Sequence, residues 1–162
     1  MSKHTLQVEY DFDFVLIGIS SHEKDYRICW ALNNKLGFKL TKTNSLEIKG
    51  KKQETPSYFS LYSFDHSEAF TEYNVIANIS ENKLAVIKQH NLFNNKELKQ
   101  EYVETEFLLP EQKQMDYLFT IKGEITELEI KKIINDIKEI DILLTAVRID
   151  VASLKSKHNL IF

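Results

Sequence analysis

The chain has 162 residues, which is the size of one domain and is enough to bury a core without disulfides or metal ions. Hydrophobic residues make up 43% and charged residues 28%, which excludes a disordered or fibrous protein. The net charge of −3 excludes nucleic-acid binding through overall positive charge. Because Cys29 is the single cysteine, an internal disulfide and a multi-cysteine zinc site are also excluded.

The chain carries no pattern of export or membrane insertion. Its first ten residues are polar and lack the apolar stretch of a secretory signal. The longest apolar run, at about residues 14–19, is far shorter than the roughly 20 residues that span a bilayer. A low cysteine content suits a reducing compartment. We therefore expect a cytoplasmic protein that has no membrane partner.

The first predicted elements are a strand and a helix. Residues 12–19 predict a strand with apolar residues on both faces, which is typical of an interior position in a sheet. Ser20 and Glu23 have the spacing of a capping box, so a helix is expected from there to about Leu36. Its predicted apolar side consists of Tyr26, Cys29, Trp30, Leu32 and Leu36. We interpret Cys29 as a core residue, because buried free cysteines are common.

The middle of the chain predicts strands. Residues 38–65 favour a hairpin with a polar, partly alternating edge strand at about 40–48 and an alternating strand at 58–64. A further strand is expected at 73–79. The weakest pattern is that of residues 81–106, which we interpret as an insertion. Within this insertion we expect a short strand at 83–88, and either a polar helix or a loop at 91–101.

The last third predicts a strand at 115–122, a helix at 125–139, a strand at 141–149 and a short final helix capped by Asp150. Thr126 and Glu129 form the capping box of the 125–139 helix. The order of elements predicts an α+β fold in a single domain, residues 1–162. We expect a mixed, mostly antiparallel sheet with two main helices on one face, as in a ferredoxin-like variant.

The most distinctive motif of the chain is LPEQKQMDY, at residues 109–117. It resembles the motif that names the IPExxxVDY family, with Leu109 in place of isoleucine and Met115 in place of valine. Residues 73–78 and 150–162 are also similar to this family. The resemblance implies a bacterial cytoplasmic protein of the Bacteroidota, and it implies no particular activity.

The chemistry of this motif has a structural interpretation and a functional one. Pro110 fixes φ and lacks an N–H, so it should begin a turn, with residue 109 in an extended conformation. Glu111 is placed to accept hydrogen bonds from backbone N–H groups, and Asp116 and Tyr117 point to opposite faces at the start of a strand. The structural interpretation is a turn that fixes strand register. The alternative is a ligand or partner site at Glu111 and Asp116.

Catalytic and cofactor motifs are weak. The four glycines are too dispersed for a phosphate-binding loop, and the five histidines lack paired metal-ligand spacing, so we expect no cofactor and no metal. Residues 18–22 match half of a nucleophile elbow, but a glycine is missing at position 22. We interpret Ser20 as a helix cap. The alternative is an anion site formed by Ser20, Ser21 and His22 at the helix N-terminus.

Positive charge is concentrated between residues 35 and 52, and aromatic residues follow it. The lysines are Lys35, Lys39, Lys42, Lys49, Lys51 and Lys52, and the aromatic residues are Tyr58, Phe59, Tyr62 and Phe64. Lysines beside sheet aromatics are the components of an RNA-binding sheet, but the stretch lacks the RNP1 pattern. The simpler interpretation is a solvated edge that prevents pairing with other sheets.

We therefore predict a non-enzymatic protein-binding or adaptor module, because no catalytic pattern stands out. The alternatives are an RNA-associated factor that uses residues 35–64, and an enzyme of unrecognised type. The apolar residues 160–162 should dock on their own domain or on a partner chain, and a homo-oligomer is one form of the latter. The candidate partner-binding residues are Lys49, Lys51, Lys52, Glu111, Asp116, Tyr117, Leu160 and Phe162.

Overall fold

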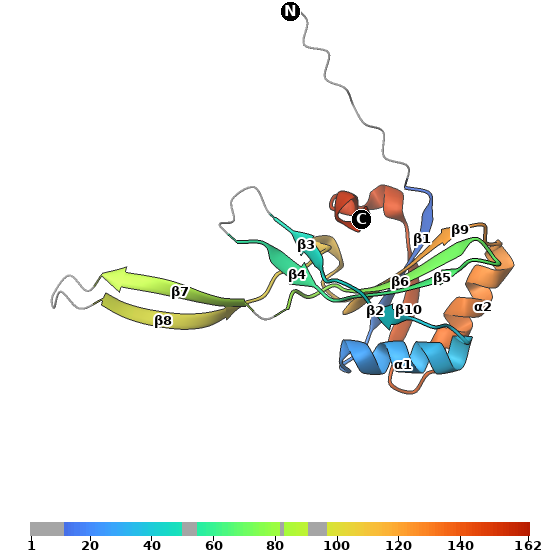
Figure 1. The fold of residues 1–162 in the computed structure, drawn as a ribbon, viewed down its shortest axis with the longest axis horizontal. Coiled ribbons are helices and arrows are strands. Elements are labelled where there is room, and N and C mark those ends of the chain that lie inside the picture. Colours follow the sequence, from blue (N-terminus) through green and yellow to red (C-terminus); the bar gives the residue numbers. More distant parts are fainter. Residues whose placement is uncertain (1–11, 50–54, 82, 91–96) are drawn as a thin grey trace, which may run out of the picture.

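Six strands form the main sheet of the computed structural model, which describes residues 12–49, 55–81, 83–90 and 97–162 (Figure 1). Across the sheet they are β10 (Thr145–Ile149), β1 (Phe14–Ser20), β9 (Tyr117–Gly123), β6 (Thr71–Ala77), β5 (Leu61–His66) and β2 (Thr41–Lys42). All neighbouring pairs in this sheet run antiparallel. The predicted α+β fold with a mostly antiparallel sheet is confirmed, and β1 lies in the interior of the sheet as expected.

Two helices, α1 (Asp25–Leu36) and α2 (Glu127–Lys138), pack on one face of this sheet. Alternation along β1 directs Ile17 and Ile19 into the core beneath the helices, whereas Leu16 belongs to a second core on the opposite face. With β1, β6, β9 and β10 as the four basic strands, the order of elements is that of a ferredoxin-like fold, extended by β5 and β2 at one edge.

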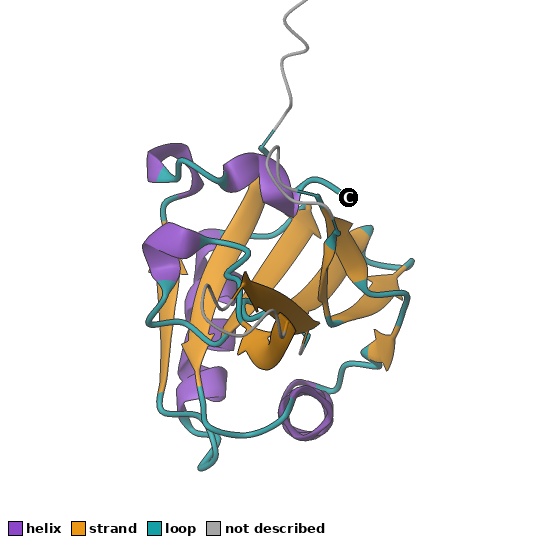
Figure 2. Cartoon of the chain, turned by 90° about the vertical axis from the view of Figure 1, so that its left-hand side faces the viewer, coloured by secondary structure: helices purple, strands orange, loops and turns teal. Residues whose placement is uncertain are grey.

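The sheet face opposite the helices is covered by irregular segments. Short 3-10 helices at Pro110–Gln112, Val151–Ser153 and Lys157–Leu160 contribute to this cover. Figure 2 shows α1 end-on below the strands and short helices on the other side. The buried residues of this second core include Leu108, Leu109, Met115, Leu154 and Leu160. Both faces of the central strands are therefore buried, which explains why their apolar residues are continuous.

The start of α1 differs from the prediction. The helix begins at Asp25, and its N-cap residue Lys24 makes no side-chain cap bond, so the capping box predicted at Ser20 and Glu23 is wrong. Its inner face is also narrower than predicted, because Tyr26 is 57% and Trp30 69% exposed. The side chains of α1 that are buried are Ile28, Cys29, Ala31 and Leu32.

The other predicted helices are confirmed in part. In α2, the Glu129 N–H donates to the Thr126 hydroxyl at 3.3 Å, and the Thr126 N–H donates to the Glu129 carboxylate at 2.8 Å, which is the predicted capping box. Asp150 accepts a hydrogen bond from Ala152 N–H as a cap, but the helix that follows is only a 3-10 turn, Val151–Ser153.

The predicted 38–65 hairpin forms in two parts. β2 pairs with β5 at the edge of the main sheet, whereas β3 (Leu46–Ile48) and β4 (Ser57–Phe59) pair as a separate two-stranded sheet. β7 (Lys83–His90) and β8 (Glu97–Glu104) form a second hairpin, which projects from the body in Figure 1. The helix or loop expected at 91–101 is therefore wrong from residue 97 on, and residues 91–96 lie outside the described residues.

Backbone bonds close the base of the projecting hairpin. Ile79 and Phe107 form an antiparallel bridge, and Ser80 N–H donates to the Glu106 carbonyl at 2.8 Å. The chain thus leaves the body and returns to it at neighbouring points. Among the described residues, no helix is long and apolar enough to cross a membrane.

Candidate functional site

An open cleft of about 610 Å³ lies where the loop before α1, the end of β6 and the start of β9 meet. We call it the polar cleft. Its lining residues are Ser21, His22, Glu23, Lys24, Asp25, Ser60, Ala77, Ile79, Ser80, Glu81, Asp116 and Tyr117. The cleft is within the size range of ligand sites in proteins. It brings together two predicted groups, Ser21 and His22 of the anion site and Asp116 and Tyr117 of the 109–117 motif.

Asp116 connects the 109–117 motif to the end of β1. Its carboxylate accepts hydrogen bonds from the Ser20 hydroxyl at 3.0 Å and from the Ser21 N–H at 2.8 Å. Its own N–H donates to the Ile19 carbonyl at 3.0 Å. The serine donors that the sequence suggested for an anion are thus engaged by a carboxylate of this chain.

The loop from Ser21 to Lys24 is held from two further sides. The Ser21 hydroxyl donates to the Ile142 carbonyl at 2.6 Å, and it accepts from the Glu23 N–H at 3.2 Å. The buried Tyr117 donates its hydroxyl hydrogen to the Glu23 carbonyl at 2.5 Å. Burial, followed by the charges of Asp25 and Asp116, raises the pKa of Tyr117. The phenol therefore stays protonated and acts as a donor that positions this wall of the cleft.

Asp25, the first residue of α1, also lines the cleft. Its carboxylate accepts a hydrogen bond from the Ser60 hydroxyl and lies 3.7 Å from the Lys42 ammonium. Burial, the charge of Asp25 and a hydrogen bond to it raise the pKa of the neighbouring Tyr62 to about 12. Asp25 thus joins the first turn of α1 to the β4–β5 connection.

Carboxylates exceed cations along the cleft. Glu23, Asp25, Glu81 and Asp116 line it, and Lys24 is the one lysine or arginine among its described lining residues. Glu23 forms an ion pair with Arg27 at 2.6 Å. Glu81 and Asp116 accept instead from neutral donors, and Glu81 does so from the Ser45 hydroxyl at 2.6 Å. Neutral donors solvate a carboxylate but leave its charge uncompensated.

The anion site predicted at Ser20, Ser21 and His22 has little geometric support. The N-terminus of α1 begins at Asp25, after these residues, and Asp116 already accepts from the Ser21 N–H. His22 is exposed at the rim of the cleft. A second anion here would lie close to the carboxylate of Asp116, which is unfavourable.

The 109–117 motif is organised around one asparagine. Asn78 is fully buried, and its side-chain amide donates to the carbonyls of Gln112 and Met115, both at 2.9 Å. Its side-chain oxygen accepts from the Leu109 N–H at 2.8 Å. Pro110 begins a 3-10 helix and Leu109 is extended, with φ −117°, as expected. These contacts favour the structural interpretation of the motif.

Glu111 binds the C-terminal segment rather than its own turn alone. Its carboxylate accepts from the Ser156 N–H at 2.7 Å. Burial raises the pKa of Glu111, but backbone hydrogen bonds, that of Ser156 foremost, outweigh this effect and leave the pKa below its ordinary value. Asn159 adds a hydrogen bond to the Leu108 carbonyl at 2.8 Å. Ser156 and Asn159 therefore hold the C-terminal segment against Glu111 of the motif and against Leu108 just before it.

The other candidate residues lie away from the polar cleft. Leu160 is buried in the second core, as expected for docking on its own domain, whereas Phe162 is half exposed. Lys49 is exposed after β3, and Lys51 and Lys52 lie outside the described residues.

The aromatic residues of the 35–64 region belong largely to the core. Phe59 and Tyr62 are buried, and Phe64 is partly buried against the core beneath the helices. Lys35 forms an ion pair with Glu139 at 2.6 Å, and the Lys42 ammonium lies 6.0 Å from the ring centre of Tyr62. Tyr58 is the one of the four aromatic residues that is well exposed. These residues therefore do not form a set of exposed rings on which nucleic-acid bases could stack.

Four residues of this region were not predicted from the sequence, namely Asn78, Asp25, Ser60 and Glu81. Asn78 carried a usable signal, because it is an amide in the otherwise apolar end of a predicted strand, where burial demands partners. The described residues contain no group of three or more histidine, cysteine or acidic side chains that could hold a metal ion. Cys29 is buried, and its pKa is raised to about 12 by burial and then by the charge of Asp25.

Comparisons with known proteins add no relative. No family model matches the chain, and searches of curated proteins and of solved structures find no significant match. The resemblance to the IPExxxVDY family therefore rests on the residues of the chain alone.

Proposed function

We propose that the chain is a protein-binding module whose polar cleft takes up a basic segment of a partner protein. The observation that carries this proposal is the excess of carboxylates over cations in an open cleft of about 610 Å³. A cleft that is lined by one sign of charge concentrates ligands of the opposite sign. Lysine and arginine side chains are the protein groups that carry the positive charge which this cleft attracts.

The cleft also offers apolar surface for the methylene groups of a lysine or arginine side chain. Ile79 lines it and is 37% exposed, beside Ala77 at the end of β6. Long basic side chains bury their methylene groups on apolar surface while the charged end stays near carboxylates. Because a single exposed ion pair contributes only about 0.2–1 kcal/mol, the segment must contact several of the carboxylates to bind.

The two alternatives have less support. For an RNA-associated factor, the lysines of region 35–64 are accompanied by aromatic rings that are largely buried, so base stacking has no platform among the described residues. For an enzyme, the cleft residue whose pKa is shifted is Tyr117, and its hydroxyl is engaged by the Glu23 carbonyl. The Tyr117 hydroxyl and the Glu23 carbonyl therefore hold the loop before α1 in place.

The test measures binding of a short lysine-rich peptide by fluorescence anisotropy, beside a matched glutamate-rich peptide. The variant combines Glu23→Gln and Glu81→Gln, because these side chains lie at the surface of the cleft, whereas Asp25 and Asp116 hold the fold. The matched control combines Glu68→Gln and Glu124→Gln, two exposed residues outside the cleft. Both double variants change the net charge equally.

We expect the lysine-rich peptide to bind the wild type and the control equally, and to bind the cleft variant at least about tenfold more weakly, a difference of about 1.4 kcal/mol. Added salt should weaken the binding, because screening reduces attraction between exposed charges. Equal binding of all three proteins, or binding of the glutamate-rich peptide, would contradict the proposal.

The cellular setting is part of the same proposal. We place the protein in the bacterial cytoplasm, as the resemblance of residues 109–117 implies, with support from the single buried cysteine. The partner is a different protein or a second copy of this chain. Light scattering of the purified protein distinguishes a homo-oligomer from a monomer that needs another partner.

A further inference from the structure

Two aromatic side chains of α1, Tyr26 and Trp30, face solvent instead of the core. Tyr26 is 57% and Trp30 is 69% exposed. They are four residues apart in the helix, so they lie on the same side of it, one turn apart. Within the part of the chain that the structure describes, cations lie over the rings of Phe12, Tyr62 and Phe107, and not over these two. Most of both side chains is therefore available to a partner.

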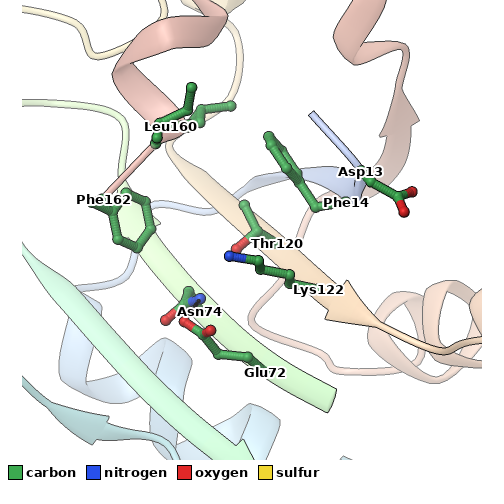
Figure 3. A pocket seen from close by; sticks show the side chains of 9 residues that line it. Asp13, Phe14, Glu72, Asn74, Thr120, Lys122, Leu160 and Phe162 are labelled. Carbon is green, nitrogen blue, oxygen red and sulfur yellow. Dashed lines mark hydrogen bonds between the residues drawn. The ribbon is translucent and has the colours of Figure 1, made fainter. Parts of the chain in front are cut away.

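Not every exposed ring of the chain is placed to contact a ligand of the polar cleft. Phe162 is 49% exposed and lines a cavity of about 70 Å³ on the sheet face opposite the helices (Figure 3). Phe70 lies just before the start of β6, whereas the cleft lies at the end of this strand. Tyr26 and Trp30, by contrast, belong to the helix that begins at the cleft.

The two rings continue the surface of the cleft along α1. Asp25 lines the cleft, and the Tyr26 N–H donates to its carboxylate at 2.8 Å. Trp30 follows Asp25 by five residues, which is roughly 7.5 Å along the helix axis. Two or three residues of an extended segment span this distance. A segment that occupies the cleft and continues along α1 can therefore reach both rings.

We infer that the basic segment bound in the polar cleft contains arginine, and that an arginine guanidinium stacks on Trp30 and Tyr26. This inference rests on the proposed function, because the carboxylates of the cleft hold the segment beside the rings. A guanidinium is planar and weakly hydrated, so it stacks on aromatic faces more readily than the ammonium of lysine does, and tryptophan is the best ring for such contacts. The nearby Arg27 is compensated by its ion pair with Glu23 at 2.6 Å.

The test compares an arginine-rich peptide with a lysine-rich peptide of equal length and charge, both measured by fluorescence anisotropy. The ring variant combines Tyr26→Leu and Trp30→Leu, which keeps both positions apolar. The matched control combines Phe70→Leu and Phe162→Leu, two exposed rings away from the cleft. Because Trp30 is the single tryptophan of the chain, its emission with unlabelled peptide reports contact at this position without any substitution.

We expect the wild type and the control to bind the arginine-rich peptide at least about threefold more tightly than the lysine-rich peptide. The ring variant should bind the two peptides equally. The arginine-rich peptide should also change the emission of Trp30 in the wild type, with the same midpoint as the anisotropy. Equal binding of the two peptides by the wild type, an arginine preference kept by the ring variant, or an unchanged Trp30 emission would each overturn the inference.

The variant that combines Glu23→Gln and Glu81→Gln separates this inference from the proposed function. If it weakens the binding of both peptides while the wild type shows no arginine preference, the inference fails and the proposed function stands. If it binds both peptides as well as the wild type does, the proposed function fails, and the inference that rests on it fails as well. The same holds if neither peptide binds the wild type.

Discussion

The side-chain oxygen of Asn78 accepts a hydrogen bond from the backbone N–H of Leu109 at 2.8 Å, 31 residues further along the chain. The same side chain donates to the carbonyls of Gln112 and Met115. One fully buried amide therefore satisfies three backbone groups of the 109–117 motif and attaches it to the end of β6. Backbone hydrogen bonds add to this attachment, from the Asn78 N–H to the Asp116 carbonyl at 2.8 Å and from the Leu108 N–H to the Asn78 carbonyl at 2.9 Å.

Asn78→Ala is expected to lower the free energy of unfolding by at least about 2 kcal/mol, because it removes the partner of the Leu109 N–H and of the Met115 carbonyl at roughly 1–3 kcal/mol each. The Gln112 carbonyl still accepts from the Met115 N–H. Urea denaturation followed by circular dichroism measures the change. The control is Asn159→Ala, which removes a single hydrogen bond to the Leu108 carbonyl. Its expected cost is about 1 kcal/mol. Equal losses in the two variants would show that Asn78 does not have this organising role.

Gly18 allows Met115 to lie against β1. A Cβ at position 18 would stand 2.7 Å from Met115 Cγ and 2.8 Å from Ile149 Cδ1, closer than van der Waals contact. Gly18→Ala should therefore cost about 1–3 kcal/mol of unfolding free energy by overpacking. Met115→Ala should cost less in the Gly18→Ala background than in the wild type, because it removes the clash. A double-mutant cycle by denaturant unfolding tests this, and strictly additive effects would contradict it.

The Glu111 carboxylate makes stability depend on pH. Its pKa lies below the ordinary value of 4.5 in the folded protein, so its hydrogen bond to Ser156 N–H contributes fully above that value. The contribution is lost as the pH falls through the lower, folded-state pKa. Glu111→Gln should therefore lower the unfolding free energy by about 1 kcal/mol at neutral pH. The difference from the wild type should shrink in acid. Thermal melts across the acidic range measure it, and a constant difference would count against this role.

Cys29 should be inert in the folded protein. Its side chain is buried and its pKa is raised to about 12, so the reactive thiolate is scarce at neutral pH. A thiol-reactive chromogenic disulfide should modify it only at the rate at which the protein unfolds, and fully in denaturant. Rapid modification under native conditions would show that the packing of α1 on the sheet is looser than described.

Local patterns were sufficient for the elements whose signals lie within a few residues. The capping box of Thr126 and Glu129 predicted the start of α2, and the two-sided apolar pattern predicted an interior β1. The start of α1 was wrong because Ser20 and Glu23 have the right spacing but different partners. Ser20 bonds to Asp116, which is 96 residues away and cannot be read from a local window.

The polar cleft could be predicted only in pieces for the same reason. Ser21, His22, Asp116 and Tyr117 were candidates, but for two separate sites, since nothing local relates residues 95 positions apart. Asp25 and Ser60 were not singled out, because their contact depends on how α1 meets the β4–β5 connection. The exposure of Trp30 could not be predicted either. Helical periodicity shows which side of a helix is apolar, but it does not specify how much of that side the sheet covers.

The Ile79–Phe107 bridge pairs the two chain segments at the base of the β7–β8 hairpin. This hairpin is therefore a position at which the chain can be replaced. Since the two ends are already paired in the body, replacing the intervening chain with a shorter or longer one changes the closure entropy only slowly. A reporter domain or affinity tag that replaces the β7–β8 hairpin beyond Ser80 and Glu81, which line the polar cleft, therefore leaves the cleft and the opposite sheet face intact.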